Sequence, residues 1–136
     1  MNHWLVKSEP FKYSWETFLK EKIAVWDGVR NYAARNNLRA MKKGDLVFFY
    51  HSNEGLEIVG IAKVKKESYQ DPTTEDANWV VVELEPFKTL KKTVTLAQIK
   101  ADKKLQDMAL IKLGRLSVQP VKQEEFDYIL TLSGTK

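Results

Sequence analysis

Two strand-forming stretches in the middle of the chain constrain its fold most. Residues 46–50 are an unbroken apolar run, and residues 57–65 are rich in Ile and Val. The Asn53-Glu54-Gly55 segment between them is a turn signal, so the two stretches predict a β-hairpin. A further strand is expected at 78–85, after a loop rich in turn-forming residues. Because strands dominate the middle and no regular βαβ alternation is visible, the sequence predicts an α+β fold built on a mixed β-barrel.

Short helices and single strands are expected on both sides of this region. Strands are predicted at 3–7 and 116–121. Ser14 and Thr95 are helix-capping residues, so helices should begin after each of them. The expected helices cover residues 14–22, 31–41, 105–111, a stretch that opens at Thr95 and a last stretch that begins near Gln123.

Length and composition narrow the class of protein. A chain of 136 residues fits a single domain spanning residues 1–136. The absence of cysteine excludes disulfides, thiolate metal sites and a cysteine nucleophile. No apolar run approaches the roughly 20 residues of a membrane span, and the first residues do not resemble a secretory signal. These features predict a cytoplasmic protein.

The excess positive charge lies in the first 50 residues. They hold nine Lys and Arg against five Asp and Glu, whereas residues 51–136 hold thirteen of each. No acidic residue occurs between Gly28 and Gly44. Such runs usually form a solvated helix face, but unrelieved like charges also suit an anion such as phosphate. The expected phosphate-binding residues are Arg30, Arg35, Arg39, Lys42 and Lys43.

Trp26 lies beside this basic run, in Trp26-Asp27-Gly28. A tryptophan is usually a core residue, yet an Asp-Gly pair directly after it disfavours a position inside a buried element. An exposed indole can stack on a nucleic-acid base, which contributes about 1 to 3 kcal/mol per base and accepts any base. The pairing of Trp26 with a basic helix therefore favours nucleic-acid binding.

Four segments spread over nearly the whole chain carry a resemblance to a known family. They are Trp4-Leu5-Val6-Lys7-Ser8-Glu9-Pro10, Trp26-Asp27-Gly28-Val29-Arg30-Asn31-Tyr32 with Ala34-Arg35-Asn36-Asn37-Leu38-Arg39, Phe48-Phe49-Tyr50-His51-Ser52, and Arg115-Leu116-Ser117-Val118-Gln119-Pro120. Together they resemble the EVE domain family. The resemblance implies a PUA-like barrel, in agreement with the strand-rich pattern. The EVE fold is similar to YTH domains, which bind methylated adenine in RNA, and EVE domains are associated with modified bases, especially modified cytosines in DNA.

The resemblance also implies a base-binding pocket around Trp26. Trp26 would stack on the base and Asp27 would lie at the edge of the base. Lys7 and Ser8 would form the floor, and His51 and Ser52 another wall. The residues expected around the base are Lys7, Ser8, Trp26, Asp27, Asn31, His51, Ser52, Ser117 and Gln119.

The preferred interpretation is a non-enzymatic module that binds DNA or RNA carrying a modified base. One alternative is an enzyme acting on a nucleotide or nucleic acid, with His51 and Asp27 as acid and base, although no nucleophile elbow surrounds a serine. Another is a pocket for a free metabolite, whose binding would depend little on salt. With two histidines and no carboxylate pair at ligand spacing, neither a metal nor another cofactor is expected.

Overall fold

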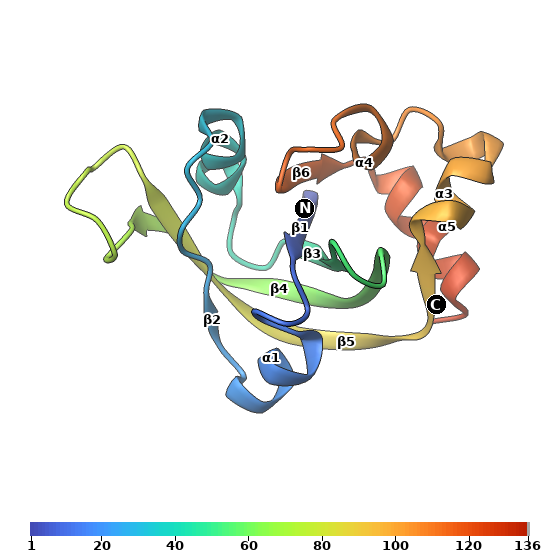
Figure 1. The fold of residues 1–136 in the computed structure, drawn as a ribbon, viewed down its shortest axis with the longest axis horizontal. Helices are drawn as coiled ribbons and strands as arrows, with labels where there is room; N and C mark the ends of the chain where they lie inside the picture. Colours follow the sequence, from blue (N-terminus) through green and yellow to red (C-terminus); the bar gives the residue numbers. More distant parts are fainter. Residues whose placement is uncertain (136) are drawn as a thin grey trace.

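A six-stranded mixed sheet organises residues 1–135, the residues that the computed structural model describes (Figure 1). Its strands are β1 (His3–Ser8), β2 (Ala24–Val25), β3 (Leu46–His51), β4 (Glu57–Gln70), β5 (Val80–Thr95) and β6 (Val118–Val121). They lie in the order β2-β5-β4-β3-β1-β6. β1 and β3 are parallel, and all other neighbouring pairs are antiparallel. Lys136, the last residue of the expected domain, lies outside the described residues.

Short helices surround the sheet. They are α1 (Trp15–Glu21), α2 (Tyr32–Ala40), α3 (Leu96–Ala101), the 3-10 helix η1 (Lys103–Leu105), α4 (Ala109–Lys112) and α5 (Gln123–Ser133). α3, α4 and α5 gather at one end of the molecule, away from α1 and α2 (Figure 1). The predicted α+β fold, a mixed barrel flanked by short helices, is confirmed.

The sheet separates two apolar cores, and β3 contributes to both because its side chains alternate between the faces. Phe49 packs on the α1 side, where its ring stacks on Phe18 at a centroid distance of 5.5 Å. Phe48 points to the opposite side and stacks on Phe126 of α5 at 4.3 Å. An unbroken apolar run at 46–50 is therefore a strand buried on both faces.

Helix α2 spans the space between the two ends of the sheet. It contacts β6 at one end and β5, which lies next to the edge strand β2, at the other. Asn37 donates from Nδ2 to the Val118 carbonyl of β6 at 2.7 Å, and Arg35 donates from Nη1 to the Asn78 carbonyl just before β5 at 3.1 Å. These contacts hold α2 against both ends of the sheet.

Four elements differ from the sequence-based expectation. β4 and β5 extend to Gln70 and Thr95, beyond the predicted ends at residues 65 and 85. β5 passes through Pro86 because this residue pairs with Ala62 where the register shifts, and an irregular ladder tolerates the missing N–H. The single helix expected at 105–111 is replaced by η1 and α4, and β2 was not foreseen.

Among residues 1–135, no helix combines the length and the apolar composition that crossing a bilayer requires.

Candidate functional site

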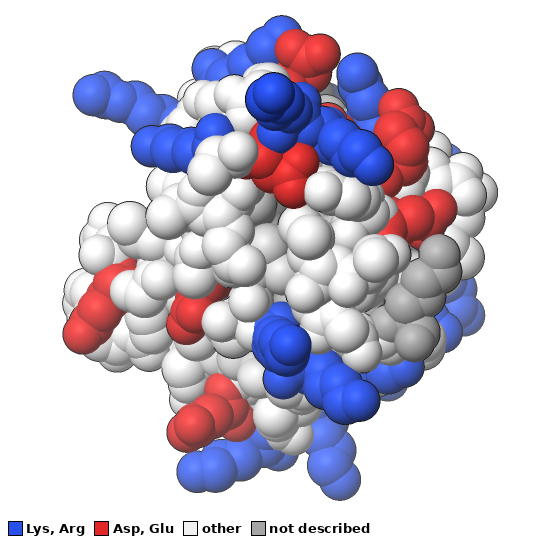
Figure 2. Space-filling view, turned by 90° about the vertical axis from the view of Figure 1, so that its right-hand side faces the viewer, with Lys and Arg blue, Asp and Glu red and all other residues white. Residues whose placement is uncertain are grey.

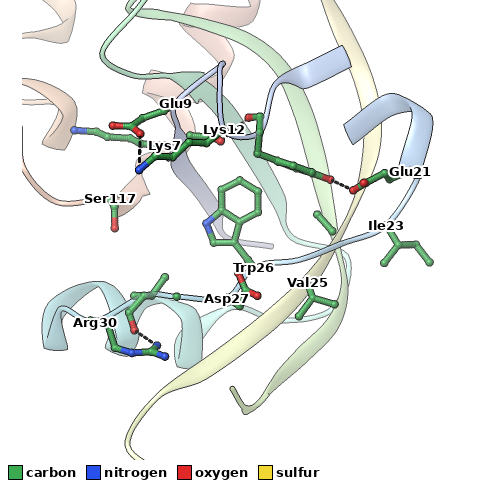
Figure 3. Close-up of a pocket in the computed structure, with 15 residues that line it drawn as sticks. Lys7, Glu9, Lys12, Glu21, Ile23, Val25, Trp26, Asp27, Arg30 and Ser117 are labelled. Atoms are coloured by element: carbon green, nitrogen blue, oxygen red, sulfur yellow. Dashed lines mark hydrogen bonds and ion pairs between the residues drawn. The ribbon is translucent and has the colours of Figure 1, made fainter. Parts of the chain in front are cut away.

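A pocket of about 710 Å³ lies where the end of β1, the connection that follows it, β2 and the turn at 26–30 meet (Figure 3). Five of the nine residues expected around a base line this pocket. They are Lys7, Ser8, Trp26, Asp27 and Ser117. Residues from both ends of the chain therefore share one wall, since β1 pairs with β6.

Trp26 lies at the centre of the pocket residues (Figure 3). Its backbone N–H donates to the Val82 carbonyl of β5 at 2.9 Å, which fixes the residue directly after β2. The half-buried indole packs edge-on against Phe49 at 5.6 Å and Tyr13 at 6.2 Å. Among residues 1–135 the indole N–H has no hydrogen-bond acceptor. Trp26 thus combines a fixed position with ring surface and a donor that face the cavity.

The turn after Trp26 is anchored by Asp71, which is fully buried. Gly28 adopts a positive φ of 75°, and its N–H donates to Asp71 Oδ2 at 3.0 Å. Arg30 Nη1 donates to the same oxygen at 3.0 Å, and the N–H and hydroxyl of Thr73 donate to Oδ1. Burial alone would raise the pKa of Asp71, but the hydrogen bonds from Thr73, Gly28 and Arg30 outweigh it and hold the pKa far below its ordinary value.

Sequence reasoning missed Asp71. It lies in a loop rich in turn formers, where an aspartate usually bonds only its own neighbours. Its partner Gly28 is 43 residues away, and nothing in the local sequence marks that contact.

Lys7 and Ser8 line the pocket, but each already forms a hydrogen bond within the protein. Lys7 Nζ donates to the Gly114 carbonyl, and burial of the side chain lowers the Lys7 pKa. The Ser8 hydroxyl donates to the Tyr13 carbonyl at 2.6 Å. A ligand would therefore meet the remaining N–H groups of Lys7 and the lone pairs of Ser8.

The connection after β1 contributes pocket residues that the sequence did not single out. Glu9 forms an ion pair with Lys12 at 3.0 Å, and the Tyr13 hydroxyl donates to Glu21 at 2.9 Å. Burial and this hydrogen bond raise the pKa of Tyr13. Both Glu9 and Glu21 line the pocket, so carboxylates contribute as much to its rim as cations do.

Asn31 and His51 lie outside the pocket lining and hold helix ends instead. Asn31 Oδ1 accepts from the Ala34 N–H at 3.0 Å at the start of α2, and His51 Nε2 accepts from the Trp15 N–H at 3.1 Å at the start of α1. Burial lowers the His51 pKa, in keeping with a neutral ring that accepts a hydrogen bond. The structure does not bring His51 and Asp27 into one cavity, because only Asp27 lines it.

Ser52 and Gln119 also lie outside this pocket lining. Ser52 lines a neighbouring pocket. Gln119 is fully buried, and its Nε2 donates to the carbonyls of Leu113 and Leu116 at 3.0 and 2.9 Å. The Gln119 Nε2 group therefore positions the 113–117 segment, while Oε1 is buried and has no hydrogen-bond partner among residues 1–135.

The cations expected to bind phosphate fall into two groups. Arg30 and Arg35 are tied to the loop before β5, through Asp71 and the Asn78 carbonyl respectively, and Arg35 lies 4.9 Å over the Tyr32 ring. Arg39, Lys42 and Lys43 are exposed, and within residues 1–135 their side chains form no ion pair. The structure thus separates cations that are bonded to the loop before β5 from cations that face solvent, and of the five only Arg30 lines the pocket.

Positive charge is not confined to the α2 side. On the face that carries α3 and α5, Lys and Arg gather in the upper and lower parts of the view (Figure 2). Residues 100–122 alone hold six Lys and Arg against two Asp. This local excess is offset by acidic residues elsewhere in residues 51–136, which hold equal numbers of basic and acidic residues.

In the part of the chain that the structure describes, no three His, Asp or Glu side chains form a group that could hold a metal ion.

Known proteins are similar to this chain in both sequence and fold. Mouse thymocyte nuclear protein 1 is 39% identical over 169 aligned positions, which cover 99% of this chain and 75% of the mouse protein. A crystal structure of an Agrobacterium tumefaciens protein is 48% identical, with a TM-score of 0.96 and coverage of 98% of this chain and 94% of the other. A crystal structure of human THYN1 in complex with DNA containing 5-methylcytosine is 36% identical, with a TM-score of 0.91 and coverage of 100% and 99%.

These likenesses confirm the PUA-like fold expected from the resemblance. Residues 2–132 match the EVE domain, which is nearly the whole chain. The chain therefore belongs to the EVE domain family.

Proposed function

We propose that this protein binds nucleic acid and receives one modified base in the pocket around Trp26. The observation that carries the proposal is the half-buried indole, fixed edge-on against Tyr13 and Phe49, with its N–H unpaired among residues 1–135 and a pocket of about 710 Å³ beside it. Human THYN1, which shares the fold at 36% identity, was crystallised with DNA containing 5-methylcytosine.

Stacking and edge contacts would have different tasks in this pocket. Stacking on Trp26 supplies about 1 to 3 kcal/mol and accepts any base. Choice among bases must come from polar groups, and the carboxylate of Asp27 suits an exocyclic amine such as that of cytosine, which donates to Asp or Glu. Ser117 and Lys7, on the facing wall, supply an acceptor and donors to the other atoms of the base edge.

Preference for a modified base needs a close fit. Burying one methyl group contributes about 0.8 kcal/mol, roughly a fourfold preference. A larger preference requires that the unmodified base leave a cavity or an unpaired polar atom, which costs about 1 to 3 kcal/mol more. The apolar wall of Ala24, Val25 and Val29 beside Trp26 is where such a group would be accommodated.

The base must leave its stack to enter the pocket, so the substrate is a single strand or a duplex from which one nucleotide is flipped. The exposed Arg39, Lys42 and Lys43 are available to the phosphates of such a strand, because none of them forms an ion pair among residues 1–135. We also propose that the protein binds without catalysing a reaction, which the separation of His51 from Asp27 supports. The chain is proposed to form a single domain built on the one sheet.

Titration of paired oligonucleotides tests the proposal. The strands carry either 5-methylcytosine or cytosine, and either N6-methyladenine or adenine, at one salt concentration. We expect tighter binding of one modified strand by up to about a hundredfold, equivalent to 2.7 kcal/mol. If every modified strand binds within error of its unmodified partner, the modified-base proposal is wrong.

Two tryptophan variants locate the effect. Trp26→Leu should weaken binding and remove the preference, because without the stacking ring the base is no longer held in the pocket where its modified group and its polar edge would be contacted. Trp79→Leu is the matched control, since Trp79 is also half-buried and packs against the Tyr32 ring at a centroid distance of 4.9 Å but does not line the pocket. Loss of the preference in both variants would show a general effect on folding.

A further inference from the structure

A second pocket of about 450 Å³ adjoins the first. The two share Lys7, Glu9 and Ser117, so they are separated by one row of side chains. The other walls come from the end of β3, α3, α4 and the 113–117 segment that Gln119 holds in place. A ligand long enough to cross the shared row would contact both pockets.

The charge of the second pocket is positive. Three cations line it, namely Lys7, Lys100 and Arg115, and the acidic residue in its lining is Glu9. Glu9 is already engaged by Lys12, at 3.0 Å, and by Asn53.

Nearby acids do not neutralise these cations either. Asp107 pairs with Lys112 at 3.0 Å, and Asp102, which accepts from the Tyr128 hydroxyl at 2.6 Å, forms no ion pair with any cation among residues 1–135. Among residues 1–135, Lys100 and Arg115 form no ion pair. The second pocket therefore suits an anion.

The remaining lining is apolar with a few polar groups. Leu56, Leu96 and Ile111 supply apolar surface, and Ser52 lies among them. Leu56 is 42% exposed, so its side chain is accessible to a ligand, whereas Tyr50 is only 2% exposed. Cations beside an apolar surface match the two parts of a nucleotide, its phosphate and its base.

We propose that the second pocket binds the nucleotide next to the modified base on the same strand, with Lys7 contacting the phosphate that joins the two. This inference rests on the proposed function, since it needs the modified base in the Trp26 pocket. Lys100 and Arg115 contact the outer phosphate, and Leu56 contacts the neighbouring base. Ser52, predicted to line the base pocket, lies in the pocket of the neighbouring nucleotide.

Lys7 is suited to the position between the two nucleotides. Its side chain is half-buried and its ammonium group donates to the Gly114 carbonyl, which leaves two N–H groups free. Burial disfavours its charged form. A bound phosphate would offset this desolvation and hold the lysine protonated.

A charge-removal variant tests the phosphate contacts. Lys100→Ala with Arg115→Ala should weaken binding of a single strand carrying 5-methylcytosine by about tenfold and lower the salt slope by about 1.4, the value for two phosphate contacts. The ratio of modified to unmodified affinity should not change, because the Trp26 pocket is intact. Lys91→Ala with Lys92→Ala is the charge-matched control on β5, outside both pockets, and should change affinity less than about twofold.

An abasic residue tests the neighbouring base. Placed on one side of the modified base, it should weaken binding to the unaltered protein by about fivefold or more, and on the other side it should have little effect. Leu56→Asn removes the apolar contact and tolerates the positive φ of 41° at this position. Strands with and without the effective abasic residue should then bind this variant nearly equally.

The outcomes separate this inference from the proposed function. If the unaltered protein keeps its preference for the modified strand but the Lys100 and Arg115 variant binds like the Lys91 and Lys92 control, the second-pocket proposal is overturned alone. Equal effects of an abasic residue on both sides would also overturn it. Absence of any modified-base preference in the unaltered protein overturns both.

Discussion

The cations on the two sides of the Trp26 pocket are held in different ways. Arg30 shares Asp71 with the backbone of Gly28, so its charge is neutralised by a buried carboxylate. Lys100 and Arg115 have no carboxylate partner among residues 1–135. A paired cation holds the pocket in shape, whereas an unpaired cation is available to a ligand phosphate. The same residue type therefore has a structural task on one side and, in the complex that we propose, a binding task on the other.

Removing the carboxylate should have the largest effect. Asp71→Ala leaves the Gly28 and Thr73 N–H groups without their acceptor, and we expect the free energy of unfolding to fall by about 3 kcal/mol. Urea denaturation measures this change in the free energy of unfolding. Asp76→Ala, in the same loop but exposed, is the control and should cost less than about 1 kcal/mol. Equal losses would mean that Asp71 is not the anchor of the turn.

Lowering the pH should weaken the hydrogen bonds that Asp71 accepts, and with them the stability of the folded protein. Because hydrogen bonds lower the Asp71 pKa in the folded protein, its contribution is fully present above the unfolded value of 3.8 and is lost as the pH falls further. The stability difference between the unaltered protein and Asp71→Asn should therefore stay constant from pH 7 to pH 5 and shrink below about pH 3.8. A difference that already shrinks between pH 7 and pH 5 would contradict this assignment. Urea denaturation at each pH gives the comparison.

The arginines themselves give a smaller contrast. Arg30→Ala should lower the free energy of unfolding by about 1 to 2 kcal/mol, because it removes hydrogen bonds to a charged, buried partner but Arg30 is itself partly exposed. Arg115→Ala should stay within about 0.5 kcal/mol, as for an exposed residue without partners. Thermal melts of both variants measure this. If Arg115→Ala costs as much as Arg30→Ala, the division into paired and unpaired cations fails.

The sequence predicts local features well. Ser14 and Thr95 each cap the helix that begins after them, as predicted, because a cap is recognised within one helical turn. The buried run at 46–50 forms β3 for the same reason, since its strand pattern lies within neighbouring residues.

Contacts between distant segments could not be read from the sequence. The basic run before residue 44 gives no sign that Arg30 and Arg35 are bound by residues 71–79, because both partners belong to a loop about 40 residues later. Gln119 has the right polar group for a base edge, yet the fold directs its amide to two backbone carbonyls. Both differences arise because burial and pairing are set by the tertiary fold.

Helix α2 contains one paired and one unpaired arginine, and replacing them should have the smallest effect on binding. Arg35 donates to the Asn78 carbonyl and lies over Tyr32, whereas Arg39, one turn later, is exposed and forms no ion pair among residues 1–135. Arg39→Ala should weaken binding of all strands about equally and lower the salt slope by about 0.7 on a single strand, the value for one phosphate contact. Arg35→Ala should lower the slope less, because its donors are already used within the protein. Fluorescence anisotropy at several salt concentrations measures both slopes, and a larger change for Arg35→Ala would show that its contacts to the loop give way to phosphate when nucleic acid binds.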